Sequence, residues 1–124
     1  MFKNKSILIT GGTGSFGKAF VKNLIQNHGD FKKLIIFSRD ELKQFEMSQQ
    51  KEFQHINLRM FLGDIRDQSR LNRAFENIDI VIHAAALKQV PVAEYNPFEF
   101  IKTNIVGTEN VINAALDHKV KNVI

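Results

Sequence analysis

A glycine-rich run, Thr-Gly-Gly-Thr-Gly-Ser-Phe-Gly at residues 10–17, directly follows an apolar segment at residues 6–9. A buried strand that turns through glycines into a helix is typical of a pyrophosphate-binding loop. Glycine lets the backbone approach a ligand closely, and the helix that follows presents free N–H groups to an anion. We therefore expect a dinucleotide site in which Gly11 forms the turn, Gly14 faces the pyrophosphate and Gly17 allows close helix–strand packing. A glycine turn without a ligand is the alternative.

The second apolar run, at residues 34–37, is followed by Ser38, Arg39 and Asp40. At this point of a dinucleotide fold, an acid accepts the ribose 2′-hydroxyl of NAD, whereas an arginine pairs with the 2′-phosphate of NADP. Ser38 stands where an acid would repel that phosphate, and Arg39 offers it a planar fork. Lys43, one helical turn on, adds a second cation. These residues favour NADP; in the alternative, Arg39 is a solvated surface residue and Asp40 binds NAD.

Two further predicted strands end in residues that suit the rest of such a ligand. Asp64 follows the third strand, where its carboxylate can accept from the adenine amino group while Ile65 packs on the ring; a plain turn residue is the alternative. The fourth strand ends in His83 and three alanines, and small residues such as Ala84 leave space for the nicotinamide. We expect His83 to be a hydrogen-bonded structural residue. Lys88 lies at the mouth where ligands bind in parallel sheets, although a surface lysine is the alternative.

The sequence offers no catalytic or metal-binding constellation of its own. Tyr95 is the only tyrosine, and Glu99 stands four residues later, so the Tyr-x-x-x-Lys pair that lowers a phenol's pKa is absent. We expect a packing role for Tyr95. The chain has no cysteine, and its four histidines lack metal-ligand spacing.

Strand and helix signals alternate along the chain, which predicts an α/β fold: a Rossmann-like doubly wound parallel sheet with helices on both faces. The Ser-x-x-Glu pattern at residues 38–41 has the form of a capping box, and Leu42 and Phe45 continue the apolar pattern of the helix it would open. The last residues, 122–124, are apolar with no turn behind them. We therefore expect a sheet truncated in its fifth strand, in the N-terminal part of a larger protein; a short edge strand at a true terminus is the alternative. Strands are expected at 6–10, 34–37, 58–62, 79–83 and 120–124, and helices at 15–27, from 38–41, from 67, and from 97 to about 118.

Composition limits the partners and the compartment. The chain has 124 residues, of which 44% are hydrophobic, so it forms at most one globular domain. The net charge is +4, but lysines and arginines are scattered rather than gathered in a stripe, which argues against nucleic acid. No apolar run approaches the roughly 20 residues of a membrane span. The absence of cysteine fits a reducing cytosol.

The motifs quoted above resemble the extended short-chain dehydrogenase/reductase superfamily: Thr-Gly-x-x-Gly-x-x-Gly, the Asp64 position and the His-Ala-Ala-Ala segment at 83–86. Narrower runs resemble the inverting UDP-N-acetylglucosamine 4,6-dehydratases. These are Phe-Ser-Arg-Asp-Glu-Leu-Lys-Gln (37–44), Ala-Ala-Ala-Leu-Lys-Gln-Val-Pro (84–91), Glu-Tyr-Asn-Pro (94–97) and Ile-Lys-Thr-Asn-Ile-Val-Gly-Thr (101–108).

The resemblance implies a tightly held NADP that is recycled. NADP takes hydride from the sugar C4, the C5 proton is removed, water leaves from C6, and hydride returns to C6 with inversion at C5. Such an enzyme takes a UDP-sugar and serves polysaccharide or flagellin glycan synthesis. A homo-oligomer of the full-length protein is also implied.

The same resemblance implies roles for particular residues. The family's catalytic aspartate–lysine and tyrosine–lysine pairs, and its sugar domain, would lie beyond Ile124, so residues 1–124 are expected to be an NADP-binding Rossmann domain that is inactive alone. A non-catalytic NADP-binding sensor and a sibling nucleotide-sugar epimerase are the alternatives. By resemblance, the pyrophosphate is held by Thr13, Gly14, Ser15, Phe16 and Gly17, the adenosine phosphate by residues 38–43, and the adenine by Asp64 and Ile65. Ala84 lies on the nicotinamide side, Lys88 faces cofactor and substrate, and Thr103 lies close to the cofactor.

Overall fold

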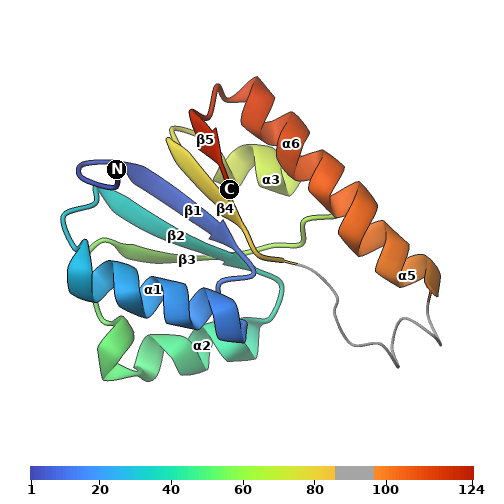
Figure 1. Ribbon diagram of the computed structural model, residues 1–124. Helices are drawn as coiled ribbons and strands as arrows, with labels where there is room; N and C mark the ends of the chain where they lie inside the picture. The colour runs from blue at the N-terminus through green and yellow to red at the C-terminus, as the bar shows by residue number, and fades with distance from the viewer. Residues whose placement is uncertain (86–96) are drawn as a thin grey trace.

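Five parallel strands form one sheet in the order β3-β2-β1-β4-β5 (Figure 1). The computed structural model describes residues 1–85 and 97–124, except for the side chains at 99, 100, 102 and 103. Consecutive neighbours in the sheet all run parallel, which confirms the predicted α/β architecture. The strands are β1 (Ser6–Thr10), β2 (Lys33–Ser38), β3 (Leu58–Leu62), β4 (Ile80–His83) and β5 (Asn122–Val123).

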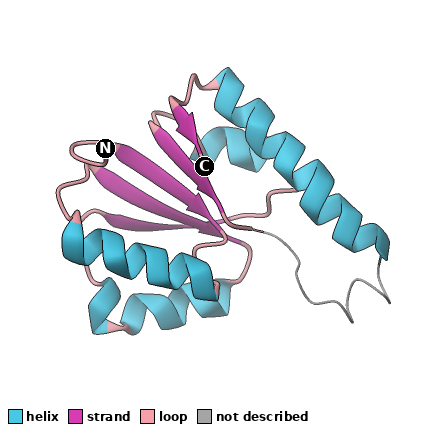
Figure 2. Ribbon diagram, viewed as in Figure 1, coloured by secondary structure: helices cyan, strands magenta, loops and turns pink. Residues whose placement is uncertain are grey.

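Helices cover both faces of this sheet, as Figures 1 and 2 show. The side chains of β1 alternate between the faces: Ile7 and Ile9 pack towards α1 and α2, and Leu8 packs towards α3 and α6. Each face therefore carries its own apolar core, and the central strand is buried on both sides. The helices are α1 (Ser15–Asn27), α2 (Glu41–Gln49), α3 (Gln68–Ala74), α5 (Pro97–Ile101) and α6 (Gly107–Asp117), with a 3-10 turn η1 (Lys51–Phe53) and a π-helical turn η2 (Lys102–Val106).

The start of α2 differs from the predicted capping box. Ser38 ends β2 and is buried, and the helix begins only at Glu41. Its N-cap is Asp40, whose Oδ1 accepts a hydrogen bond from the backbone N–H of Lys43 at 3.0 Å. The capping-box prediction was wrong because the strand extends through Ser38, which leaves Asp40 as the first side chain free to reach the exposed N–H groups.

The glycine loop brings α1 unusually close to the end of the sheet. Gly11 has a φ of +71°, and a Cβ there would stand 2.8 Å from the backbone of Ala85. A Cβ on Gly17 would stand 2.5 Å from the Cα of Gly12. Gly14 is different, because its Cβ would meet only the Gly11 carbonyl oxygen, at 3.4 Å. Gly11 and Gly17 thus require glycine because backbone atoms stand against them, whereas Gly14 is sterically open.

His83, at the end of β4, joins the sheet to the long helix by a directional chain of hydrogen bonds. The Thr10 hydroxyl accepts from the backbone N–H groups of Ala84 and Ala85 at 3.1 and 3.3 Å. Its own hydrogen is then donated to Nδ1 of His83, 2.7 Å away. The imidazole is therefore the Nε2–H tautomer, which donates to the Thr108 hydroxyl at 3.1 Å. The expectation of a structural histidine is confirmed.

The chain of hydrogen bonds that starts at Thr10 ends in the π-helical turn. Thr108 donates its hydroxyl hydrogen to the carbonyl of Asn104 at 2.8 Å, within η2. The predicted continuous helix from 97 to about 118 is thus interrupted by one wider turn, and a side-chain hydrogen bond satisfies a carbonyl there. Burial lowers the pKa of His83 below the 6.5 of an exposed imidazole. The ring therefore stays neutral, as the chain of hydrogen bonds through Thr10 and Thr108 requires.

We predict that Gly17→Ala destabilises the protein by at least about 2 kcal/mol, because the methyl group would meet backbone atoms that cannot move aside. The matched control, Gly14→Ala, should cost less than about 1 kcal/mol, since its Cβ makes an ordinary contact. Urea unfolding followed by circular dichroism measures both. Equal losses for the two variants would show that the loop is not packed as described.

We predict that acidification weakens the fold through His83. Its pKa is lower in the folded than in the unfolded chain, so the unfolded state binds the proton more readily and stability falls as the pH drops below about 6.5. Unfolding free energies at pH 7.5 and 5.5 should therefore differ more in the natural protein than in His83→Gln. Parallel pH dependence in the two proteins would contradict this role.

Candidate functional site

A cavity of about 690 Å³ opens at the carboxyl ends of β1, β2 and β3 and the segment that follows β4. The structure brings together here every predicted site residue except two. Lys88 lies outside the described residues, and Thr103 belongs to η2 but its side chain is not described. Phe37, Gly63 and Ala85 also line the cavity and were missed by sequence reasoning. The predicted residues that line it are Gly11, Thr13, Gly14, Ser15, Phe16, Gly17, Ser38, Arg39, Asp40, Lys43, Asp64, Ile65 and Ala84.

The amino end of α1 forms one wall of the cavity. Its N-cap, Gly14, makes no side-chain cap hydrogen bond, and no acidic residue stands in the first turn. Thr13 is only 6% exposed, and its hydroxyl makes no hydrogen bond to any residue that the structure describes. A hydroxyl that faces the cavity without a protein partner, beside free helical N–H groups, is a donor set that suits an anionic oxygen.

Phe16 does not pack in the core, although it falls on the apolar pattern of α1. Its side chain is 61% exposed and its ring stacks on Phe20, with the centroids 6.2 Å apart. The buried positions of the helix are Gly17, Val21 and Leu24. The close contact of Gly17 with Gly12 fixes the rotation of α1, and this rotation places Phe16 at the rim of the cavity.

Cationic side chains gather on the opposite wall. The Arg39 side chain is half-exposed, and its Nη1 lies 3.8 Å from Oδ2 of Asp64. Lys43 lies in the first turn of α2 and lines the same cavity. Asp40 lines it too, but its Oδ1 is engaged in capping α2. Ser38 is 8% exposed and contributes its hydroxyl where β2 ends.

Asp64 holds a second arginine that the sequence analysis did not single out. The Arg66 guanidinium donates to both carboxylate oxygens, with contacts of 2.7 to 3.1 Å. Burial alone would raise the pKa of Asp64, but the hydrogen bonds and charge of Arg66, together with the charge of Arg39, hold it below 3.8. The predicted adenine contact would have to share an oxygen that already accepts hydrogen bonds from Arg66.

Ile65 lies between the cavity and the core. It is 4% exposed and packs on Gly107 at the start of α6, where a Cβ would meet it at 2.5 Å. The amide of Asn110 donates to the Ile65 carbonyl at 3.0 Å. These contacts hold the loop after β3 against α6 and so fix the position of the cavity floor.

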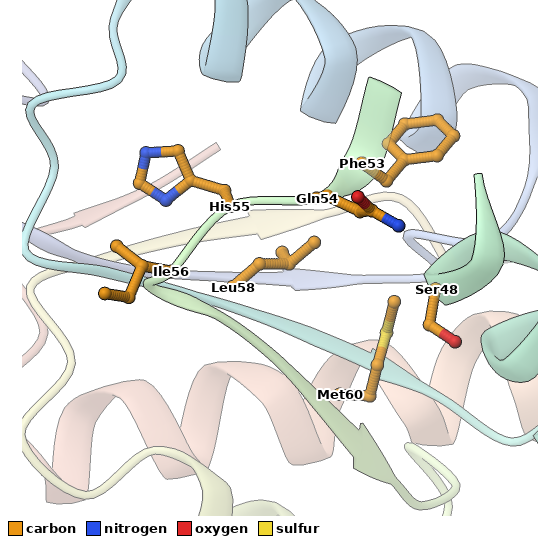
Figure 3. A pocket seen from close by; sticks show the side chains of 7 residues that line it. All are labelled: Ser48, Phe53, Gln54, His55, Ile56, Leu58 and Met60. Atoms are coloured by element: carbon orange, nitrogen blue, oxygen red, sulfur yellow. The ribbon is translucent and has the colours of Figure 1, made fainter. Parts of the chain in front are cut away.

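A second cavity, of about 500 Å³, lies beside β3 (Figure 3). Its titratable side chain, His55, is already used: Nδ1 accepts from the Asn57 N–H at 3.1 Å, and Nε2 donates to the Gly29 carbonyl at 3.2 Å. None of the predicted site residues lines this cavity. The first cavity, where the glycine loop meets the cationic side chains, is therefore the candidate site. The second is lined by Ser48, Phe53, Gln54, His55, Ile56, Leu58 and Met60.

In the parts of the chain that the structure describes, two other kinds of site are absent. No three histidine, aspartate or glutamate side chains come together there as a metal site. No helix in these parts has the length and apolar character needed to cross a bilayer.

Two curated relatives of this chain are named as enzymes that act on nucleotide sugars. It is 58% identical to the UDP-N-acetylglucosamine 4,6-dehydratase (inverting) of Campylobacter jejuni strain 81-176, over all of this chain and 36% of that protein. It is 45% identical to the UDP-glucose 4-epimerase of Rickettsia typhi over the same shares. The chain thus spans about a third of the length of these relatives.

Solved structures agree with the fold. Pen from Bacillus thuringiensis superposes with a TM-score of 0.93 at 47% identity, over 99% of this chain and 37% of that one. DesIV, a dTDP-glucose 4,6-dehydratase from Streptomyces venezuelae with NAD and TYD bound, gives a TM-score of 0.80 at 27% identity, over 95% and 38%. These structures confirm the Rossmann-like fold.

A sequence profile of one family matches nearly the whole chain. The match extends over residues 7–124 and so includes the glycine loop, the strand ends that line the cavity and the long helix. On this evidence the chain belongs to the polysaccharide biosynthesis protein family.

Proposed function

We propose that residues 1–124 are the NADP-binding Rossmann domain of an inverting UDP-N-acetylglucosamine 4,6-dehydratase. The observation that carries this proposal is the single cavity in which the glycine loop, the free amino end of α1 and two cations meet. The similarity to the Campylobacter dehydratase supports the reaction, and the family supports a role in making a polysaccharide or glycan.

The residues present fit a dinucleotide in chemical terms. The backbone of the glycine loop and the unpartnered Thr13 hydroxyl would hold the pyrophosphate, which is rich in acceptor oxygens. Ala84 and Ala85 leave room at the far end for a flat ring. When bound, the nicotinamide would accept a hydride from the sugar and return it. The NAD bound to DesIV supports a nicotinamide cofactor of this kind.

The phosphorylated form, NADP, is favoured by the charges at the adenosine end. A side cavity of about 180 Å³ adjoins the loop and is lined by Lys18 and Lys43 together with Thr13 and Ser15. Among the described residues, neither ammonium group lies within 4 Å of a carboxylate. Lys43 also lines the larger cavity together with Arg39, so two cations meet where NAD would offer only a hydroxyl group, and the one carboxylate that lines the side cavity is Glu46.

In this proposal the residues of this chain bind the cofactor and orient it, and none of them is assigned a catalytic role. Lys88 and Thr103 are proposed to face the nicotinamide side, with Lys88 also close to the UDP-sugar. The segment alone is therefore expected to hold NADP without forming a 4-keto sugar. Detection of that product by NMR from residues 1–124 would refute this division of labour.

A sibling nucleotide-sugar 4-epimerase is the second candidate, because the Rickettsia relative is 45% identical. Product analysis by NMR with UDP-N-acetylglucosamine separates the two. A dehydratase releases a 4-keto-6-deoxy sugar, whereas an epimerase keeps the C6 hydroxyl and inverts C4.

We also propose that the whole enzyme works as a cytoplasmic homo-oligomer. The helical segment from α5 to α6 exposes large apolar side chains that a second copy could cover. Light scattering on the full-length protein tests this, and a monomer would refute it. The exposed residues are Phe98, Ile101, Ile105, Ile112 and Leu116.

We predict that Arg39→Gln weakens NADP binding by about ten- to a hundredfold, because a charge-assisted bond to the 2′-phosphate is lost. Binding of NAD should change by less than about twofold. Arg73→Gln, the same change at an exposed position of α3 outside the cavity, is the control and should alter neither affinity. Isothermal titration calorimetry measures both cofactors; a natural protein that prefers NAD would overturn the assignment of NADP.

A further inference from the structure

Gln44 is a buried polar side chain on α2, only 7% exposed. Its Nε2 lies 3.2 Å from the Ser38 carbonyl, 3.1 Å from the Phe61 carbonyl and 2.9 Å from the Ser38 hydroxyl oxygen. Carbonyl oxygens only accept hydrogen bonds, so the amide must turn its NH₂ group towards them. The three contacts together fix Gln44 as a donor and tie the ends of β2 and β3 to α2.

This orientation determines the direction of the Ser38 hydroxyl. Because its oxygen accepts from Gln44, its hydrogen points away from the amide and is available to another acceptor. Ser38 makes no other side-chain hydrogen bond to the described residues, and it lines the cavity beside Arg39 and Lys43. The hydroxyl therefore presents a donor to whatever occupies this end of the cavity.

We propose that Gln44 is a positioning residue that selects the phosphorylated cofactor by setting Ser38 as a donor. This inference rests on the proposed function. A 2′-phosphate dianion only accepts, and a hydrogen bond to a charged acceptor is about twice as strong as one to a neutral group. A 2′-hydroxyl can donate as well as accept, so it gains less from a fixed donor. Gln44 thus acts on the phosphate through Ser38 without touching it.

The direct test is Gln44→Met, which keeps the length of the side chain and removes the donor. Ser38 then loses the hydrogen bond that orients its hydroxyl, which becomes free to rotate away from the cavity. The dissociation constant for NADP should rise about tenfold and that for NAD by less than about twofold, as measured by calorimetry. Ser38→Thr keeps the hydroxyl and should retain the NADP preference. An equal loss for both cofactors in Gln44→Met would overturn the proposal.

A double-mutant cycle isolates the coupling. Ser38→Ala leaves the bonds from Gln44 to both carbonyls in place and should lower the NADP preference on its own. Adding Gln44→Met to Ser38→Ala should then leave the ratio of the two affinities unchanged. A further fall in that ratio would show that Gln44 acts by another route.

A measurement on the natural protein covers the case in which Gln44→Met does not fold. The side-chain NH₂ signals of Gln44 should shift more on addition of NADP than of NAD, and this difference should vanish in Ser38→Ala. Equal shifts would overturn the inference. A natural protein that prefers NAD would instead overturn the proposed function, so the two failures are distinguishable.

Discussion

The close contact between α1 and the loop that precedes it is the constraint on which the site depends. With Gly17 against Gly12, and Gly11 against Ala85, no side chain separates the helix from the ends of β1 and β4. The free N–H groups of the helix consequently face the same space as the strand ends. A larger residue at either contact would move the helix outwards, and the donor set would no longer converge on one ligand.

Buried polar side chains then fix the elements around that space. Gln44 ties α2 to β2 and β3, Asp64 anchors Arg66 beside Arg39, and His83 links β1 to the long helix. Each forms bonds that would be costly to break inside the protein. The cavity is therefore held by specific hydrogen bonds as well as by apolar packing, which suits a site that must keep its donors in place before a ligand arrives.

Much of the fold could be predicted because it rests on local signals. The apolar runs predicted β3 at its observed bounds, and the glycine spacing predicted where α1 begins. Gln44 was missed because its partner Phe61 stands 17 positions away, and nothing local marks a buried glutamine. Leu42 and Phe45 follow the apolar pattern of the sequence but face solvent, at 64% and 61% exposure, because the hydrogen-bonded side chain of Gln44 sets the rotation of α2. The π-helical turn is likewise linked to a distant residue, because Thr108 accepts from His83 and donates to the Asn104 carbonyl in that turn.

The measurement that tests the central claim most directly is an NMR titration of backbone amides with NADP. If the loop and the strand ends form one anion-binding site, the largest shifts will fall in residues 11–17 and 38–43, while residues 53–56 beside the second cavity stay unchanged. Shifts concentrated around that second cavity, or no saturable shifts at all, would contradict the account.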